Sequence, residues 1–104
     1  MSTKINVIIR GQSKQDTDSV LKNVTLMSNI AFQDQVIQED TIYTIKWNYN
    51  LNGATVNIPA RCVLDFTGGK LSNGTINWNG TKILNRYQYS ILENITETGD
   101  KIIL

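Results

Sequence analysis

Carboxylates with basic neighbours are the side chains of this sequence that could support cleavage of a sugar chain. That chemistry needs paired Asp or Glu residues, or a carboxylate beside a basic group. The best candidate cluster is Asp65 with Arg61 or Lys70. The alternation of apolar and polar residues places Asp65 on the outer face of a strand. We therefore interpret the cluster as part of a solvated surface and predict no catalytic site.

Two pairs of acidic residues could bind a calcium ion through their oxygens. Asp16 and Asp18 form one pair, and Glu39 and Asp40 form the other. Neither pair has the spacing of the carboxylates in an EF-hand loop. We interpret both pairs as polar loops, so the sequence predicts no metal and no cofactor.

Cys62 is the only cysteine in a chain that has no histidine. One thiol cannot form an intrachain disulfide or a thiolate zinc site. No imidazole is present to activate it as a nucleophile. Cys62 falls on the inward side of its strand, where a free cysteine behaves as a small hydrophobic residue. We expect it to be a buried structural residue.

Aromatic side chains alternate with polar residues at strand spacing and could serve in two ways. They could line a sugar-binding groove. They could instead form the core and subunit interfaces, where Trp and Tyr bury a large area at low entropic cost. The second interpretation is favoured. The residues concerned are Trp47, Tyr49, Phe66, Trp78, Tyr87 and Tyr89.

Composition limits the classes of function. The chain has 104 residues, a length typical of one domain, and a formal net charge of +1 with its basic residues scattered singly. It has no basic stripe of the kind that indicates nucleic acid binding. No apolar run approaches the roughly 20 residues that span a bilayer, and the first residues do not resemble a signal peptide. We expect a soluble protein that contacts neither nucleic acid nor membrane.

The elements that must position these side chains are short strands. From residue 41 to residue 83, alternating apolar segments are separated by Asn-Gly and Gly-Gly turns. Abundant Ile and Thr favour strands, because their branched side chains pack well on a pleated surface. The first of these runs is predicted to direct inward Ile45, Trp47, Tyr49 and Leu51.

Part of this block repeats itself. The segment Thr55-Val56-Asn57-Ile58 returns as Thr75-Ile76-Asn77-Trp78, twenty residues later. A period of this length is about one coil of a β-solenoid. The sequence therefore predicts an all-β fold with a short β-solenoid of about two coils. Asn-Gly between alternating runs also signals hairpins, so a β-meander remains the alternative.

Two regions are predicted along the chain. Residues 1–40 form an N-terminal segment for anchoring or oligomerisation, mainly extended, and within it residues 19–40 fit either a helix or strands. Residues 41–104 form the solenoid-like domain. It is predicted to end in a hairpin, in which residues 101–104 pair across a polar turn with residues 87–92 of a strand at 86–92. Packing of residues 101–104 into a partner is the alternative.

Residues 51–59 (L-N-G-A-T-V-N-I-P) and 63–76 (V-L-D-F-T-G-G-K-L-S-N-G-T-I) carry a resemblance. They resemble the opening coils of right-handed β-helix segments in fibre and tail proteins of phages that infect Bacteroides-type hosts, including crAss-like phages. The resemblance covers about 45 of the 104 residues. It implies a right-handed β-helix in a virion structural protein, such as a short head-fibre or capsid-decorating component. Such fibres are commonly trimeric, and their longer relatives continue into further coils.

We therefore expect a non-enzymatic protein of the virion, made in the host cytoplasm. Its expected partners are copies of itself (a trimer is favoured), a capsid or other virion protein, and a possible host surface glycan. Open strand edges and apolar ends would aggregate unless partners cover them. The alternatives are a carbohydrate-binding module of a tail or surface protein and a fragment of a polysaccharide lyase or hydrolase. The predicted subunit interface consists of Ile5, Val7, Ile9, Trp47, Trp78, Ile102 and Leu104.

Overall fold

A computed structural model describes residues 21–104, and most regular structure in this part of the chain is strand. Every strand pair in it is parallel. One short helix, α2, spans Phe32–Gln35. The strands are β1 (Lys22–Thr25), β2 (Thr41–Ile45), β3 (Tyr49–Asn50), β4 (Thr55–Asn57), β5 (Val63–Phe66), β6 (Leu71–Asn77), β7 (Thr81–Asn85), β8 (Leu92–Thr98) and β9 (Lys101–Ile103).

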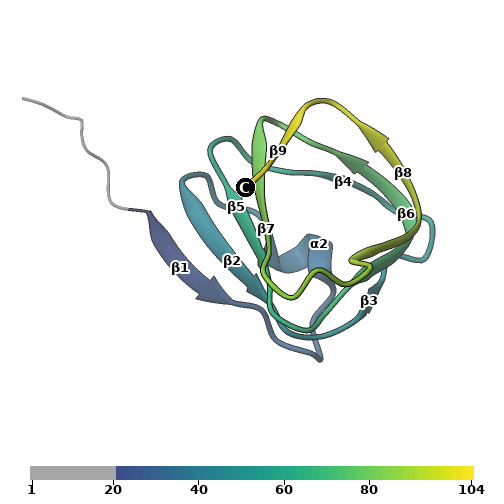
Figure 1. Cartoon of the computed structure of the whole chain (residues 1–104). Helices are drawn as coiled ribbons and strands as arrows, with labels where there is room; N and C mark the ends of the chain where they lie inside the picture. The colour runs from purple at the N-terminus through teal and green to yellow at the C-terminus, as the bar shows by residue number, and fades with distance from the viewer. Residues whose placement is uncertain (1–20) are drawn as a thin grey trace, which may run out of the picture.

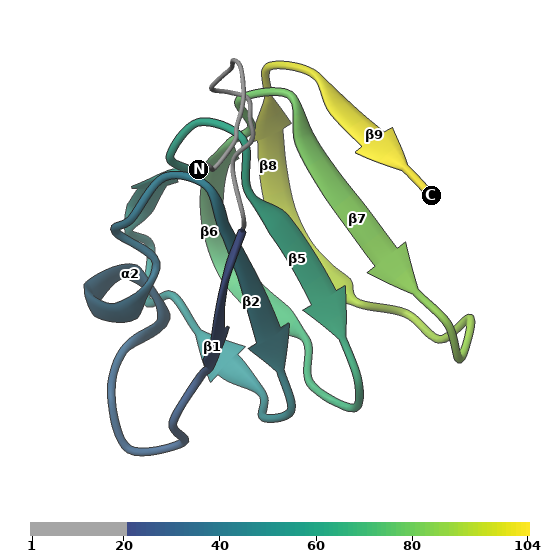
Figure 2. The ribbon, with the colours of Figure 1, turned by 90° about the vertical axis from the view of Figure 1, so that its left-hand side faces the viewer.

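The strands wind around a common core as a β-solenoid (Figure 1). One sheet has the order β1-β2-β5-β7-β9, so each strand lies one coil beyond its neighbour (Figure 2). Five successive strands make four turns, which confirms the predicted solenoid and corrects its expected two coils to four. The recognisable repeat covered only the middle coils, because the strands at both ends of the solenoid are more polar.

The other side of the solenoid is built around β6, the long strand that pairs with β3, β4 and β8. The first residues of β6 pair with β3, and its last residues pair with β4. Between them lies Asn73, with a φ of 58°. This left-handed residue bends the strand around a corner, and Asn adopts that conformation more readily than most residues.

The alternative β-meander and the C-terminal hairpin are wrong. β9 pairs with β7 and β8 pairs with β6, both in parallel. Residues 93–98, expected as a polar turn, are most of β8, and the expected strand at 86–92 is mainly a loop. β8 has a polar sequence because, within the described part of the chain, no further coil covers this strand and most of its side chains remain exposed. The polar sequence was therefore predicted to be a turn. The Asn-Gly dipeptides turn corners within a coil instead of reversing the chain.

The core consists of columns of inward side chains, one from each coil. The pairing register places in one column Val24, Tyr43, Leu64, Ile83 and Ile103. The middle members Tyr43, Leu64 and Ile83 are at most 1% exposed. Burying a side chain of this size stabilises the fold by roughly 1.5–3 kcal/mol. Stacking of successive coils is therefore the main source of stability.

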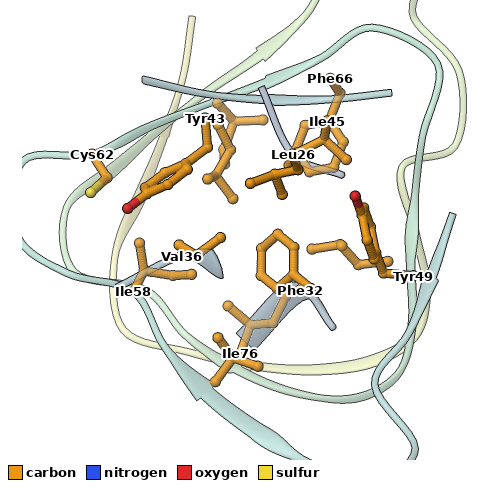
Figure 3. Packing of buried hydrophobic residues seen from close by; sticks show 14 of the residues in the cluster. Leu26, Phe32, Val36, Tyr43, Ile45, Tyr49, Ile58, Cys62, Phe66 and Ile76 are labelled. Carbon is orange, nitrogen blue, oxygen red and sulfur yellow. The ribbon is translucent and has the colours of Figure 1, made fainter. Parts of the chain in front are cut away.

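The N-terminal end of the core is closed by the chain itself. After β1 the chain folds over this end, and α2 lies across the N-terminal end of the core (Figure 2). Leu26, Phe32 and Val36 are 1–2% exposed and pack in the same cluster as the sheet residues (Figure 3). The rings of Phe32 and Tyr49 lie 5.8 Å apart between centroids.

Residues 21–40 thus form a strand, a short helix and the cap of the first coil. Residue 40, the expected boundary between two regions, is not a break in packing. The expected strand face with Ile5, Val7 and Ile9 lies outside the described residues.

Candidate functional site

The predicted acid–base cluster does not assemble. Asp65 forms its ion pair with Arg86, at 3.5 Å between Oδ2 and Nη2. Lys70 instead pairs with Glu93 on the next coil, at 2.7 Å. The Lys70 ammonium lowers the pKa of the Glu93 carboxyl through this hydrogen bond. Asp65, Lys70 and Arg61 each bind a different partner. Each is closer to an opposite charge on a neighbouring coil than to the other two residues of the predicted cluster.

Arg61 forms ion pairs with Glu39 and Asp40, the acidic residues considered as a possible calcium site. Its Nε lies 2.6 Å from Asp40 Oδ1, and its Nη2 lies 3.2 Å from Glu39 Oε1. The guanidinium hydrogen bond holds the pKa of Asp40 below its ordinary value. Within residues 21–104, no group of three or more acidic, His or Cys side chains is placed to hold a metal ion. Asp16 and Asp18 lie outside that range.

Cys62 is buried on the inward side of the corner before β5, where the sequence predicted it. Its Sγ donates toward the carbonyl oxygen of Gln38 at 3.2 Å. Burial raises the pKa of the thiol. A protonated, hydrogen-bonded thiol is a poor nucleophile, so Cys62 serves packing.

The aromatic side chains divide between core and surface. Tyr49 and Phe66 are buried, as expected for core residues. Trp78 is 5% exposed, so the structure places it in the core and not on a free interface surface. Trp47 is half exposed, although alternation had placed it inward. The strand ends at Ile45 and residues 46–48 turn a corner, which interrupts the alternation.

The C-terminal end of the solenoid has a different surface from the N-terminal end. Its last inward positions carry charges: Glu97 pairs with Ile76 of β6, and Lys101 pairs with Thr81 of β7. Lys101 Nζ and Glu97 Oε1 form an ion pair. The Trp78 indole Nε1 donates to the same Glu97 oxygen at 2.9 Å. These polar side chains cover one part of the core end.

Apolar side chains form the rest of this end. Ile103 stands in the inward column above Ile83, yet it is 62% exposed because no coil follows it among the described residues. Ile102 and Leu104, two residues of the predicted interface, are exposed too. Sequence reasoning missed the roles of Glu97 and Lys101. The repeat of twenty residues would have aligned Ile76 with Thr96, whereas the pairing register spaces these coils by 21 residues and aligns Ile76 with Glu97.

A shallow hollow lies at the corner that follows β5 and β7. It has a volume of about 400 Å³ and is lined by Thr67, Gly68, Tyr87 and Tyr89. The Tyr89 hydroxyl accepts a hydrogen bond from the Gly68 N–H at 2.9 Å and donates to the Gly69 carbonyl at 2.6 Å. Burial raises the pKa of Tyr89. The Tyr89 ring is therefore held against the Gly-Gly turn.

Together these features define a parallel β-solenoid whose N-terminal end is closed by its own chain and whose C-terminal end is uncovered within the described residues. Comparison with protein-family models, with curated proteins and with solved structures finds no match to this chain. Among the described residues, no helix has the length and apolar character needed to cross a membrane.

Proposed function

We propose that this chain is a non-enzymatic structural protein of a phage virion. It is a fibre component that docks on the capsid and self-associates as a trimer. The observation that carries the proposal is the difference between the two ends of the solenoid. The N-terminal end is plugged by Phe32 and Val36, whereas the C-terminal end exposes Ile102, Ile103 and Leu104.

Strand edges that have no partner support assembly at the C-terminal end. Within residues 21–104, β8 and β9 each pair on one side, with β6 and β7. Backbone N–H and C=O groups on an open edge can bind another strand, and natural proteins normally cover or protect such edges. A partner that packs here would cover Ile103, which stands in the inward column, and satisfy the edge at the same time.

Charges at the same end favour a closed assembly over a filament. Inward-facing charged residues are a common device against indiscriminate addition of strands. Glu97 and Lys101 occupy such positions beside the apolar rim. A second solenoid stacked coaxially on this end would have to desolvate both groups. Packing a few copies around an axis can bury the rim and leave the ion pair in contact with water.

Sedimentation equilibrium on the purified chain tests the self-association. We expect the mass of three 11.7 kDa chains. The variant Ile103→Glu should shift the protein to monomers, because it places a charge in the buried rim. Ile37→Glu is the matched control, since Ile37 is equally exposed but follows α2 at the closed end. A wild-type monomer at micromolar concentration, or equal dissociation of both variants, would contradict the proposal.

Mass spectrometry of purified virus particles tests the location. The chain should be present with the capsid proteins after density-gradient purification. Cross-linking should join it to a capsid protein. Recovery in the soluble lysate, without any in the particles, would rule out a virion component.

A further inference from the structure

We propose that the hollow formed by Thr67, Gly68, Tyr87 and Tyr89 binds a neutral sugar ring of a glycan chain. This site is separate from the C-terminal rim, so it does not depend on self-association. It lies at the corner after β5 and β7, whereas the rim is formed by the residues of β9 and the chain end.

The two tyrosines provide an aromatic surface at the hollow. Tyr87 is 67% exposed, more than any other large apolar side chain in the described residues. Tyr89 is fixed by its hydroxyl to the Gly68–Gly69 turn, and its carbonyl oxygen accepts a hydrogen bond from Asn85 Nδ2 at 2.8 Å. A preformed aromatic surface loses little entropy when a ligand binds. The C–H face of a pyranose ring packs against such a surface.

Oxygen atoms without a partner gather around the same corner. Within the described residues, the buried side-chain oxygens that lack a hydrogen bond are Asp65 Oδ1, Thr67 Oγ1 and Asn85 Oδ1. All three belong to the ends of β5 and β7 or directly follow them. Buried polar atoms normally have partners, so each exception calls for an explanation. Thr67 lines the hollow, so a bound group can reach this residue.

The chemistry of these atoms favours a sugar over a cation. A cation of the calcium type takes six or more oxygen ligands with several carboxylates. Asp65 is the one carboxylate here, and Arg86 already pairs with it. Sugar hydroxyls, in contrast, can donate to neutral and charged oxygens alike. A ring with an apolar face and adjacent hydroxyls therefore matches the tyrosines and Thr67, the one of these three residues that lines the hollow.

The size of the hollow favours a sugar over a protein partner. A stable protein interface involves about 20–30 residues on each side. Four residues line this hollow, and its volume of about 400 Å³ is within the range of small-ligand sites.

Saturation-transfer NMR on the full chain tests the proposal. The probes are methyl glycosides of glucose, galactose, mannose and N-acetylglucosamine, with their β- and α-linked trisaccharides. At least one neutral probe should bind with a millimolar dissociation constant, and Tyr87→Ala should weaken it about tenfold or more, a loss of about 1.4 kcal/mol. Thr67→Val, which keeps the shape and removes the hydroxyl, should also weaken binding.

Ile37→Ala is the matched control, because it removes an equally exposed apolar side chain that follows α2, away from the residues that line the hollow. It should leave sugar binding unchanged. Circular dichroism of each variant verifies the fold. The proposal is overturned if no neutral probe binds at about 20 mM, if Tyr87→Ala binds as well as wild type, or if the hollow captures a protein and no sugar.

Discussion

Lys101 and Glu97 form an ion pair across the open end of the solenoid, against the buried indole of Trp78. The Lys101 ammonium lies 5.7 Å from the Trp78 ring centroid, and Glu97 accepts the indole N–H. Both charged residues stand where the preceding coil has Ile76 and Thr81. The last coil in the described part of the chain therefore carries a charged pair where the preceding coil has core residues, and this pair remains partly in contact with water.

Glu97 should make the stability of the protein depend on pH. The hydrogen bond from Lys101 lowers the pKa of Glu97 in the folded state from its ordinary 4.5. The folded state then binds protons less readily, so this contribution is present above pH 4.5 and is lost as the pH falls through the folded pKa. Glu97→Gln should cost at most about 1 kcal/mol at neutral pH, because the pair is partly exposed.

Urea unfolding at neutral pH and at about pH 3 checks this prediction. The difference between wild type and Glu97→Gln should shrink in acid. Asp100→Asn, an exposed acidic residue in the same coil, should show a smaller difference at neutral pH. A difference for Glu97→Gln that stays constant with pH would contradict the assigned role of the ion pair.

Phe32→Ala should remove the plug from the N-terminal end. Phe32 is 1% exposed and contacts Tyr49, so truncation leaves a cavity in the core. The expected loss in the free energy of unfolding is about 3–5 kcal/mol. Ile37→Ala should change it by less than about 0.5 kcal/mol, because Ile37 is exposed. Comparable losses in chemical denaturation would show that the segment after β1 does not close the core.

Gly69→Ala should be more destabilising than Gly53→Ala. A Cβ atom on Gly69 would overlap the backbone carbonyl of Trp47 on the neighbouring coil, and backbone cannot move aside cheaply. We expect a cost of about 3 kcal/mol or more, the upper range for overpacking. Gly53 faces open space and has a φ of 81°, so alanine there costs about 1–2 kcal/mol of backbone strain. Thermal unfolding would show the order, and the reverse order would refute the close approach of the coils.

Asn73→Ala should destabilise the protein more than Asn73→Gly. Asn73 has a φ of 58°, which glycine adopts without strain and alanine does not. Its Oδ1 accepts a hydrogen bond from Asn94 Nδ2 at 2.9 Å, and both variants lose this bond. The difference between them should be about 1 kcal/mol in favour of glycine. Equal stabilities in urea would mean that the left-handed corner is not required.

The spacing of asparagines shows how much of the fold the sequence carried. Asn52, Asn73 and Asn94 lie 21 residues apart, and all have left-handed φ angles near 55°. Extending this period from the recognisable middle block would have predicted the last coil. The repeat of apolar pairs alone was insufficient, because β8 carries Glu97 where β6 carries Ile76.

The candidate site was less accessible to sequence reasoning. Composition and alternation correctly placed Cys62 and Tyr49 in the core. These placements succeeded because the direction of a strand side chain depends only on residues close in sequence. Ion pairs and hollows depend on which residues meet one coil apart. Tyr89 meets Gly68 and Gly69 because parallel coils stack in one particular register.

The sequence by itself determined an all-β chain with a coil of about twenty residues, since alternation and turn residues are local properties. The tertiary structure decided the number of coils, the closure of one end by Phe32 and the burial of Trp78. It also brought Glu97 to Lys101 across the open end. These outcomes follow from the pairing register between coils, which arises when the whole core packs and which short sequence patterns do not encode.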